Sequence, residues 1–141
     1  MKKIILTSIF VLTLFTSLHL QAQCNKSVKE LEQLCLMDTT KFKAYAMKNG
    51  IEFTNRTEDY IEYHCSKEKS TKYFIKFTPT KWFQFEFTDK TWLDSLYKQL
   101  RERDYNIIEK ENHQRFASKT FFLQIIANDD GYYVVVISKK Q

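Results

Sequence analysis

The chain has 141 residues, of which 43% are hydrophobic, 16% aromatic and 28% charged, and its formal net charge is +5. This composition is typical of a folded chain rather than a disordered one, and the length allows one domain or two very small repeats. Because Gly50 and Gly131 are the only glycines, no glycine-rich loop can bind a phosphate, which excludes Walker-type and dinucleotide-binding fingerprints.

Residues 1–22 have the pattern of a secretory signal peptide. Two lysines precede an apolar run that is interrupted by hydroxyl residues and followed by Ala22 at a cleavage position. The run is shorter than the roughly 20 apolar residues of a membrane-spanning helix. We therefore expect cleavage after Ala22, a periplasmic or secreted protein with no stable membrane insertion, and a single α+β domain over residues 23–141.

Two further features of the mature chain bear on its partners. Cleavage leaves 20 basic against 17 acidic residues, a net charge of about +3, and the two signs alternate in segments such as 101–104. Nucleic-acid binding needs clustered cations in larger excess, so no nucleic-acid partner is expected. Residues Gln21 to Gln23 match a lipoprotein box poorly, and the sequence leaves lipid modification of Cys24 open.

The three cysteines, Cys24, Cys35 and Cys65, all lie in the expected mature chain. An exported protein reaches a compartment that permits disulfides, and three cysteines give one bridge and one free thiol in any of three pairings. Cys35 lies on the apolar face of a predicted helix, and Cys65 lies on the inward face of a predicted strand. We expect Cys35 to pair with Cys65, with a Cys24–Cys35 bridge as the alternative.

Three helices are predicted along the mature chain. Ser27 and Glu30 have the spacing of a capping box and begin a helix over 28–36. Asp38 or Thr39 begins a second helix that ends at Asn49-Gly50. A third helix begins after Thr91 as its N-cap, and its apolar stripe is expected to pack on a sheet.

Apolar residues alternate with period two after residue 51, which predicts strands. On the first strands we expect inward faces made by Ile61, Tyr63 and Cys65, by Tyr73, Ile75 and Phe77, and by Phe83, Phe85 and Phe87. Four more strands are expected near 105–109, 115–117, 121–126 and 132–137. Residues 78–81 and 128–131 join two predicted hairpins.

The fold class expected from this order is α+β, with two or three helices packed on an antiparallel β-sheet. A helix followed by about four strands occurs twice, which suggests two degenerate α-β-β-β-β half-repeats over 38–88 and 89–141. The alternative is a chance alternation of two unrelated stretches. The order of elements resembles that of the secreted β-lactamase inhibitors, in which helix-and-sheet units occur in tandem.

Few residues offer chemistry for catalysis or metal binding. Glu62, His64 and Cys65 form the one mixed cluster, but neighbours on a strand face opposite sides of the sheet, and no second cysteine or histidine stands at a zinc-like spacing. His64 and His113 are the only histidines left after signal cleavage. We therefore expect no metal, no cofactor and no enzymatic activity.

The strongest candidate for a binding surface is the aromatic hairpin over 73–87. Alternation sends Trp82, Gln84 and Glu86 away from the phenylalanine face, and we expect Phe74 and Lys76 beside them. Such a mixed aromatic and charged surface is typical of protein interfaces. The alternative is that a helix, the one that carries Trp92 and Leu96, covers it and the whole hairpin is interior.

These features predict a non-enzymatic module that binds a protein, acting as an inhibitor or immunity-type neutraliser. The alternative functions are a structural or assembly component of the bacterial cell envelope, and an envelope enzyme with an unrecognised site.

Overall fold

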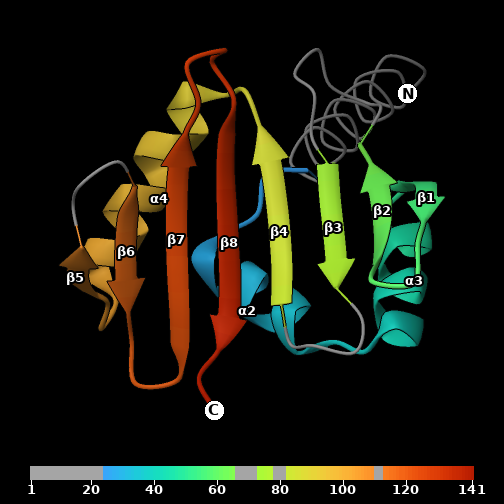
Figure 1. Cartoon of the computed structure of the whole chain (residues 1–141), viewed down its shortest axis with the longest axis horizontal. Helices are drawn as coiled ribbons and strands as arrows, with labels where there is room; N and C mark the ends of the chain where they lie inside the picture. Colours follow the sequence, from blue (N-terminus) through green and yellow to red (C-terminus); the bar gives the residue numbers. More distant parts are fainter. Residues whose placement is uncertain (1–23, 66–72, 78–81, 110–112) are drawn as a thin grey trace, which may run out of the picture.

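The structure is a computed structural model that describes residues 24–65, 73–77, 82–109 and 113–141. Within these residues the fold is mixed α+β, with three helices and one eight-stranded antiparallel sheet (Figure 1), as the sequence predicts. The helices are α2 (Val28–Leu36), α3 (Thr39–Lys48) and α4 (Lys90–Glu102). The strands are β1 (Glu52–Arg56), β2 (Tyr60–His64), β3 (Tyr73–Phe77), β4 (Trp82–Phe87), β5 (Asn106–Glu109), β6 (Gln114–Ala117), β7 (Phe121–Ala127) and β8 (Tyr133–Lys139). The expected signal peptide and the expected turn over 78–81 lie outside the described residues.

Two antiparallel meanders make up the sheet, whose strand order is β1-β2-β3-β4-β8-β7-β6-β5. The last strand of each meander lies at the centre, where β4 pairs with β8 in antiparallel register. Helices precede four strands in each half, as the sequence predicts; that the halves are degenerate repeats stays a prediction. No helix in the described part of the chain is long and apolar enough to cross a bilayer.

Side-chain caps begin each helix. The capping box of Ser27 and Glu30 is present at α2, and the Asp38 carboxylate accepts from the Lys41 amide at 2.8 Å at the start of α3. The prediction for α4 is wrong by two residues, because Asp89 is its N-cap and accepts from the Trp92 amide at 3.2 Å. A carboxylate two positions earlier thus supplies the acceptor that we expected from Thr91.

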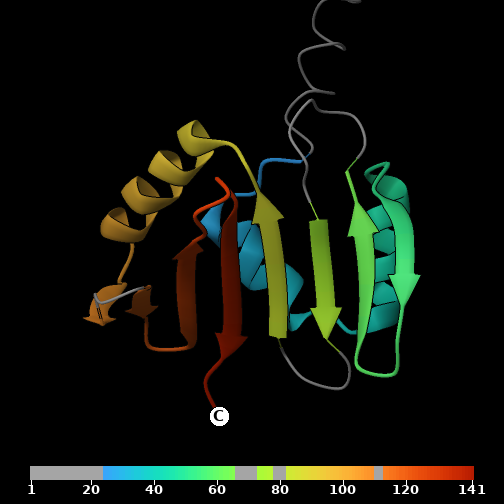
Figure 2. The ribbon, with the colours of Figure 1, turned by 45° about the horizontal axis from the view of Figure 1, so that its top comes forward.

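All three helices pack on one face of the sheet (Figures 1 and 2). Phe83, Phe85 and Phe87 point to the same side of β4 and are fully buried. Phe42 of α3 contacts Phe83, with ring centres 5.6 Å apart, and Trp92 of α4 contacts Phe87 at 4.2 Å. Because these rings meet one side of the same strand, α3 and α4 share that face.

The inward face predicted for β3 is wrong. Phe74 pairs with Phe85 and Lys76 pairs with Phe83, so both side chains point towards the helices, and both are buried. Ile75 pairs with Gln84 and faces the other way. The strand carries apolar residues on both faces, so alternation alone does not determine which face points inward.

The disulfide joins Cys24 to Cys65, whose Cα atoms are 6.3 Å apart. Both the expected pairing, Cys35 with Cys65, and the alternative, Cys24 with Cys35, are therefore wrong. Cys35 is buried and lies outside the disulfide, and its Sγ donates to the Ile137 carbonyl at 3.6 Å, over the sheet centre. Because the bridge uses the Cys24 sulfur, the bridged form of the protein carries no lipid thioether there.

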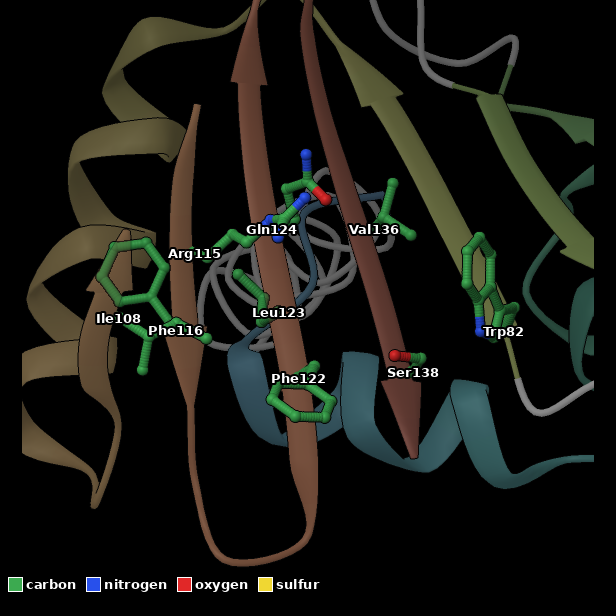
Figure 3. A pocket seen from close by; sticks show the side chains of 9 residues that line it. All are labelled: Trp82, Ile108, Arg115, Phe116, Phe122, Leu123, Gln124, Val136 and Ser138. Carbon is green, nitrogen blue, oxygen red and sulfur yellow. The ribbon is translucent and has the colours of Figure 1, made fainter. Parts of the chain in front are cut away.

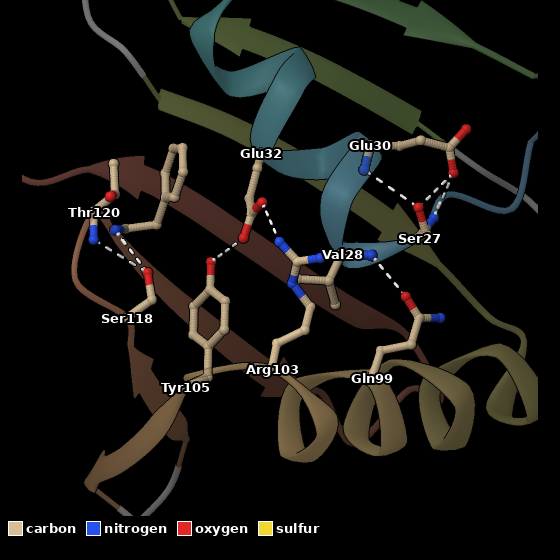
Figure 4. Close-up of polar contacts among 10 residues, drawn as sticks. Ser27, Val28, Glu30, Glu32, Gln99, Arg103, Tyr105, Ser118 and Thr120 are labelled. Atoms are coloured by element: carbon tan, nitrogen blue, oxygen red, sulfur yellow. Dashed lines mark hydrogen bonds and ion pairs between the residues drawn. The ribbon is translucent and has the colours of Figure 1, made fainter.

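Polar contacts hold helix α2 at both ends. The Val28 amide donates to Oε1 of Gln99 on α4 at 2.9 Å (Figure 4). Glu32 accepts from the Arg103 guanidinium at 2.7 Å and from the Tyr105 hydroxyl at 2.9 Å. At the other end of α2, Lys76 Nζ donates to the Cys35 carbonyl at 2.8 Å.

Removal of the disulfide is expected to destabilise the protein. Cys65→Ser opens a bridge between residues 41 positions apart, and loop entropy puts the loss at about 3–4 kcal/mol of unfolding free energy. Urea unfolding measures this loss, with Cys35→Ala as a control that keeps the bridge. Alkylation of the denatured, unreduced protein should label one thiol, Cys35; labelling of Cys24 or Cys65 would contradict the pairing.

Alkaline pH is expected to weaken the fold through two tyrosines. Burial, with a smaller contribution from Glu30, raises the pKa of Tyr45 to about 12, and burial, together with the hydrogen bond to Glu32, raises the pKa of Tyr105. The unfolded state has an ordinary tyrosine pKa of about 10 and loses its proton first. This contribution to stability is complete below about pH 10 and is lost as the pH rises towards 12.

Unfolding free energies at pH 8 and pH 11 test this titration. We expect the alkaline loss of stability to be smaller in Tyr45→Phe than in the unaltered protein, because phenylalanine has no proton to lose. An equal loss in Tyr45→Phe, Tyr105→Phe and the unaltered protein would show that these hydroxyls do not couple to folding.

Candidate functional site

No described helix packs on the side of the sheet that faces away from α2, α3 and α4. We call this side the open face. The strand register assigns it these residues of the central and C-terminal strands: Ile75, Trp82, Gln84, Glu86, Arg115, Phe122, Gln124, Ile126, Val134, Val136 and Ser138.

Pairing across the strands arranges the open face in rows. Trp82 of β4 pairs with Ser138 of β8, and Ser138 pairs with Phe122 of β7. A small side chain therefore lies between two large aromatic ones. Trp82 is 50% exposed and Phe122 is 45% exposed.

The neighbouring row supplies polar groups beside these rings. Gln84 pairs with Val136, Val136 with Gln124, and Gln124 with Arg115. Gln84 Nε2 donates to Glu86 Oε1 at 2.7 Å, which fixes the amide of Gln84 on β4. The open face thus combines exposed aromatic rings with amide and charged groups.

A cavity of about 320 Å³ is recessed into the C-terminal half of this face (Figure 3). We call it the notch. The residues that line it are Trp82, Ile108, Arg115, Phe116, Phe122, Leu123, Gln124, Val136 and Ser138. They come from five neighbouring strands, β4 to β8, so the notch exists only because β4 pairs with β8.

The structure brings together three of the five predicted binding residues. Trp82, Gln84 and Glu86 share the open face, as expected. The expectation that Phe74 and Lys76 lie beside them is wrong, because both side chains are buried on the helix side of β3. The helix that we considered as a cover for Trp82, α4, packs instead on the phenylalanine side of β4.

Lys76 has a structural role in the core. It is only 2% exposed, and its Nζ donates to the carbonyls of Cys35 at 2.8 Å and Trp82 at 3.1 Å. A buried ammonium is tolerated only with such hydrogen-bond partners. Lys76 therefore joins the end of α2 to the beginning of β4.

Sequence reasoning missed the half of the open face that β7 and β8 contribute. Phe122, Gln124 and Val136 lie in largely apolar segments. In such segments the alternation of apolar and polar residues does not show which face of the strand points towards the core. The pairing of Trp82 with Ser138 joins positions 56 residues apart in the chain. No local pattern predicts such a pairing.

The described residues hold no group of three histidine, cysteine or acidic side chains that could bind a metal ion. Cys65 belongs to the disulfide, and the thiol of Cys35 is buried in the core. The open face presents aromatic rings, amides and the Arg115 guanidinium.

The structural role of Lys76 can be tested by replacing it with methionine. Lys76→Met keeps the aliphatic stem but removes the hydrogen bonds to the carbonyls of Cys35 and Trp82, at a cost of about 2–4 kcal/mol of unfolding free energy. Lys43→Ala, which removes an exposed lysine side chain, is the control, and it should change the unfolding free energy by less than about 0.5 kcal/mol. Unchanged stability in Lys76→Met would contradict this role.

No protein-family model matches the chain, and neither a curated protein nor a solved structure matches it. The function has to be inferred from the open face itself.

Proposed function

We propose that the chain is a small, exported, non-enzymatic protein-binding module, which acts as an inhibitor or immunity-type neutraliser in the periplasm or outside the cell. It binds its partner with the open face, through Trp82, Gln84 and Glu86 on β4 and through the residues of β7 and β8 beside them. The observation that carries the proposal is the contrast between the two faces of one sheet. Three helices pack on one face, and half-exposed rings of Trp82 and Phe122 stand on the other.

The chemistry of the open face supports a protein partner. Tryptophan, phenylalanine and arginine are enriched at protein interfaces, where large rings act as anchors. Trp82 and Phe122 provide such rings, and Arg115 lies in the adjoining row. Apolar groups exposed together on one face commonly mark an interaction site.

The size of the face also fits a protein partner. An eight-stranded sheet is roughly 34 Å wide, and strands of up to seven residues are roughly 20 Å long. The face therefore covers on the order of 700 Å², close to the roughly 800 Å² that each partner contributes to an interface of standard size.

The disulfide supports the proposed location. A bridge between Cys24 and Cys65 persists in oxidising compartments such as the periplasm and the extracellular medium. Cys24 also lies two residues after the proposed cleavage point, so the bridge fastens the new N-terminus to the end of β2.

Truncation of the tryptophan tests the proposed binding face. Trp82→Ala is expected to weaken binding of the partner by about tenfold or more, as for an interface anchor, because it removes a half-exposed ring from the open face of the central strand β4. The stability should change by less than about 1 kcal/mol. Calorimetry with a partner purified from the periplasmic fraction measures the affinity, and urea unfolding measures the stability.

A matched control lies on a helix. Met47→Ala removes a side chain of α3 that is 71% exposed, and it should leave the affinity unchanged. Equal affinities of Trp82→Ala and the unaltered protein would exclude this face as the binding site. A partner that fractionates with membrane complexes would favour the envelope-assembly function over neutralisation.

A further inference from the structure

The disulfide joins the first and third cysteines of the chain and skips the second. Cys24 and Cys65 form the bridge, 41 residues apart, and Cys35 lies outside it. In an unfolded chain, the probability that a loop closes falls as roughly the −3/2 power of its length. Cys24 and Cys35 are only 11 residues apart. The unfolded chain therefore favours a Cys24–Cys35 bridge over the native one by roughly sevenfold.

The order of synthesis favours the same short bridge. A chain is made from its N-terminus, so Cys24 and Cys35 precede Cys65 in an exported chain by 30 residues. An oxidant that meets the emerging chain finds the first two cysteines before the third. The native partner of Cys24 is thus the last of the three to become available.

The fold itself excludes the short bridge. Helix α2 begins at Val28, and a rise of 1.5 Å per residue places Cys35 roughly 10 Å further along its axis. Ser27, the N-cap, enters the helix in an extended conformation, so Cys24 precedes the end of the helix that is opposite to Cys35. A disulfide needs Cα atoms within about 7 Å of each other. The bridge that closes most readily in the unfolded chain is therefore incompatible with the folded α2.

Folding also ends the exchange between pairings. Cys24, Cys35 and Cys65 are all buried, and the Cys35 Sγ donates to the Ile137 carbonyl at 3.6 Å. Donation requires a protonated thiol, whereas thiol–disulfide exchange requires a thiolate that can reach a disulfide sulfur. The exchange from a short bridge to the native bridge therefore has to take place before α2 packs on the sheet.

We propose that the protein folds through a transient Cys24–Cys35 bridge and is a substrate of a disulfide isomerase, an enzyme whose accessible thiolate rearranges disulfides. The uncatalysed rearrangement takes seconds to hours, during which the sheet lacks its α2 cover. The inference rests on the export that we propose above, because oxidase and isomerase belong to an oxidising compartment. It does not depend on the open face.

The reaction has one oxidation and two exchange steps. A disulfide oxidase forms the Cys24–Cys35 bond, and its own disulfide is reduced to two thiols. The isomerase thiolate then attacks Sγ of Cys24, the bond to Cys35 breaks, and Cys35 leaves as a thiolate that takes up a proton. Cys65 gives up its proton, attacks the same sulfur of Cys24 and releases the isomerase thiolate. The two exchange steps involve no net oxidation.

Oxidative refolding of the purified exported protein tests the order of the bridges. The reduced protein is oxidised with glutathione disulfide, first in urea and then after dilution of the urea, and N-ethylmaleimide stops the exchange at set times. Trypsin cleaves after Lys26, Lys29 and Arg56, so the three pairings give different linked peptides in the mass spectrum. We expect Cys24–Cys35 to exceed Cys24–Cys65 by roughly sevenfold in urea and to be replaced by it after dilution.

The isomerase step is tested during the same dilution. A catalytic amount of a purified disulfide isomerase is expected to speed the replacement by about tenfold or more. The same enzyme with its thiols alkylated is the control and should have no effect. Cys35→Ala cannot form the transient bridge, so its native bridge should appear without a lag and at a rate that the isomerase does not change.

Cys65→Ser provides the opposite variant. It lacks the cysteine that resolves the transient bridge, so it should stop at Cys24–Cys35 with or without the isomerase. The measurement in urea does not require either variant to fold.

Three results would overturn the inference: Cys24–Cys65 as the main bridge in urea, equal lags in Cys35→Ala and the unaltered protein, or equal rates with the active and the alkylated isomerase. None of these readouts involves a binding partner. They are therefore distinct from the Trp82→Ala test, which decides the proposed function by itself.

Discussion

Helix α2 lies over the seam where β4 pairs with β8, and polar contacts hold it at both ends. The Val28 amide and Glu32 connect it to α4 and to the segment that follows α4. At the other end, Lys76 donates to the Cys35 carbonyl. Because this seam joins the two meanders, the packing of α2 against it determines which face of the whole sheet is buried.

The burial of one face under the helices leaves the other face without a described helix on it. On β4, residues alternate between the fully buried phenylalanines and the residues of the open face. The same alternation on β8 buries Val135 and Ile137 and leaves Val136 and Ser138 on the open face. One sheet thus supplies the buried core on one face and, in the proposed function, the binding surface on the other.

The sequence predicts local features well because local chemistry determines them. The Ser27 capping box and the helical period after it locate α2 to the residue. Strict alternation on β4 identifies its inward phenylalanines, since Gln84 and Glu86 are polar. On β3 the apolar residues occupy both faces, and the buried Lys76 could not be distinguished from a surface lysine.

Features that depend on distant pairing could not be predicted. The Cys24–Cys65 bridge joins the segment before α2 to the end of β2, while Cys35 is turned towards Ile137 on β8. The notch requires Trp82 and Phe122 to lie on either side of Ser138. Both depend on the order of strands in the sheet, which no local pattern of residues reveals.

The central claim, a sheet with one buried and one open face, can be tested directly because the chain has two tryptophans, one for each face. Trp92 is 5% exposed and Trp82 is 50% exposed. In Trp82→Phe the fluorescence reports Trp92 alone, and we expect blue-shifted emission that is protected from acrylamide quenching. In Trp92→Phe the fluorescence reports Trp82 alone, and we expect red-shifted emission that acrylamide quenches readily. Equal protection of the two tryptophans would contradict the one-sided sheet.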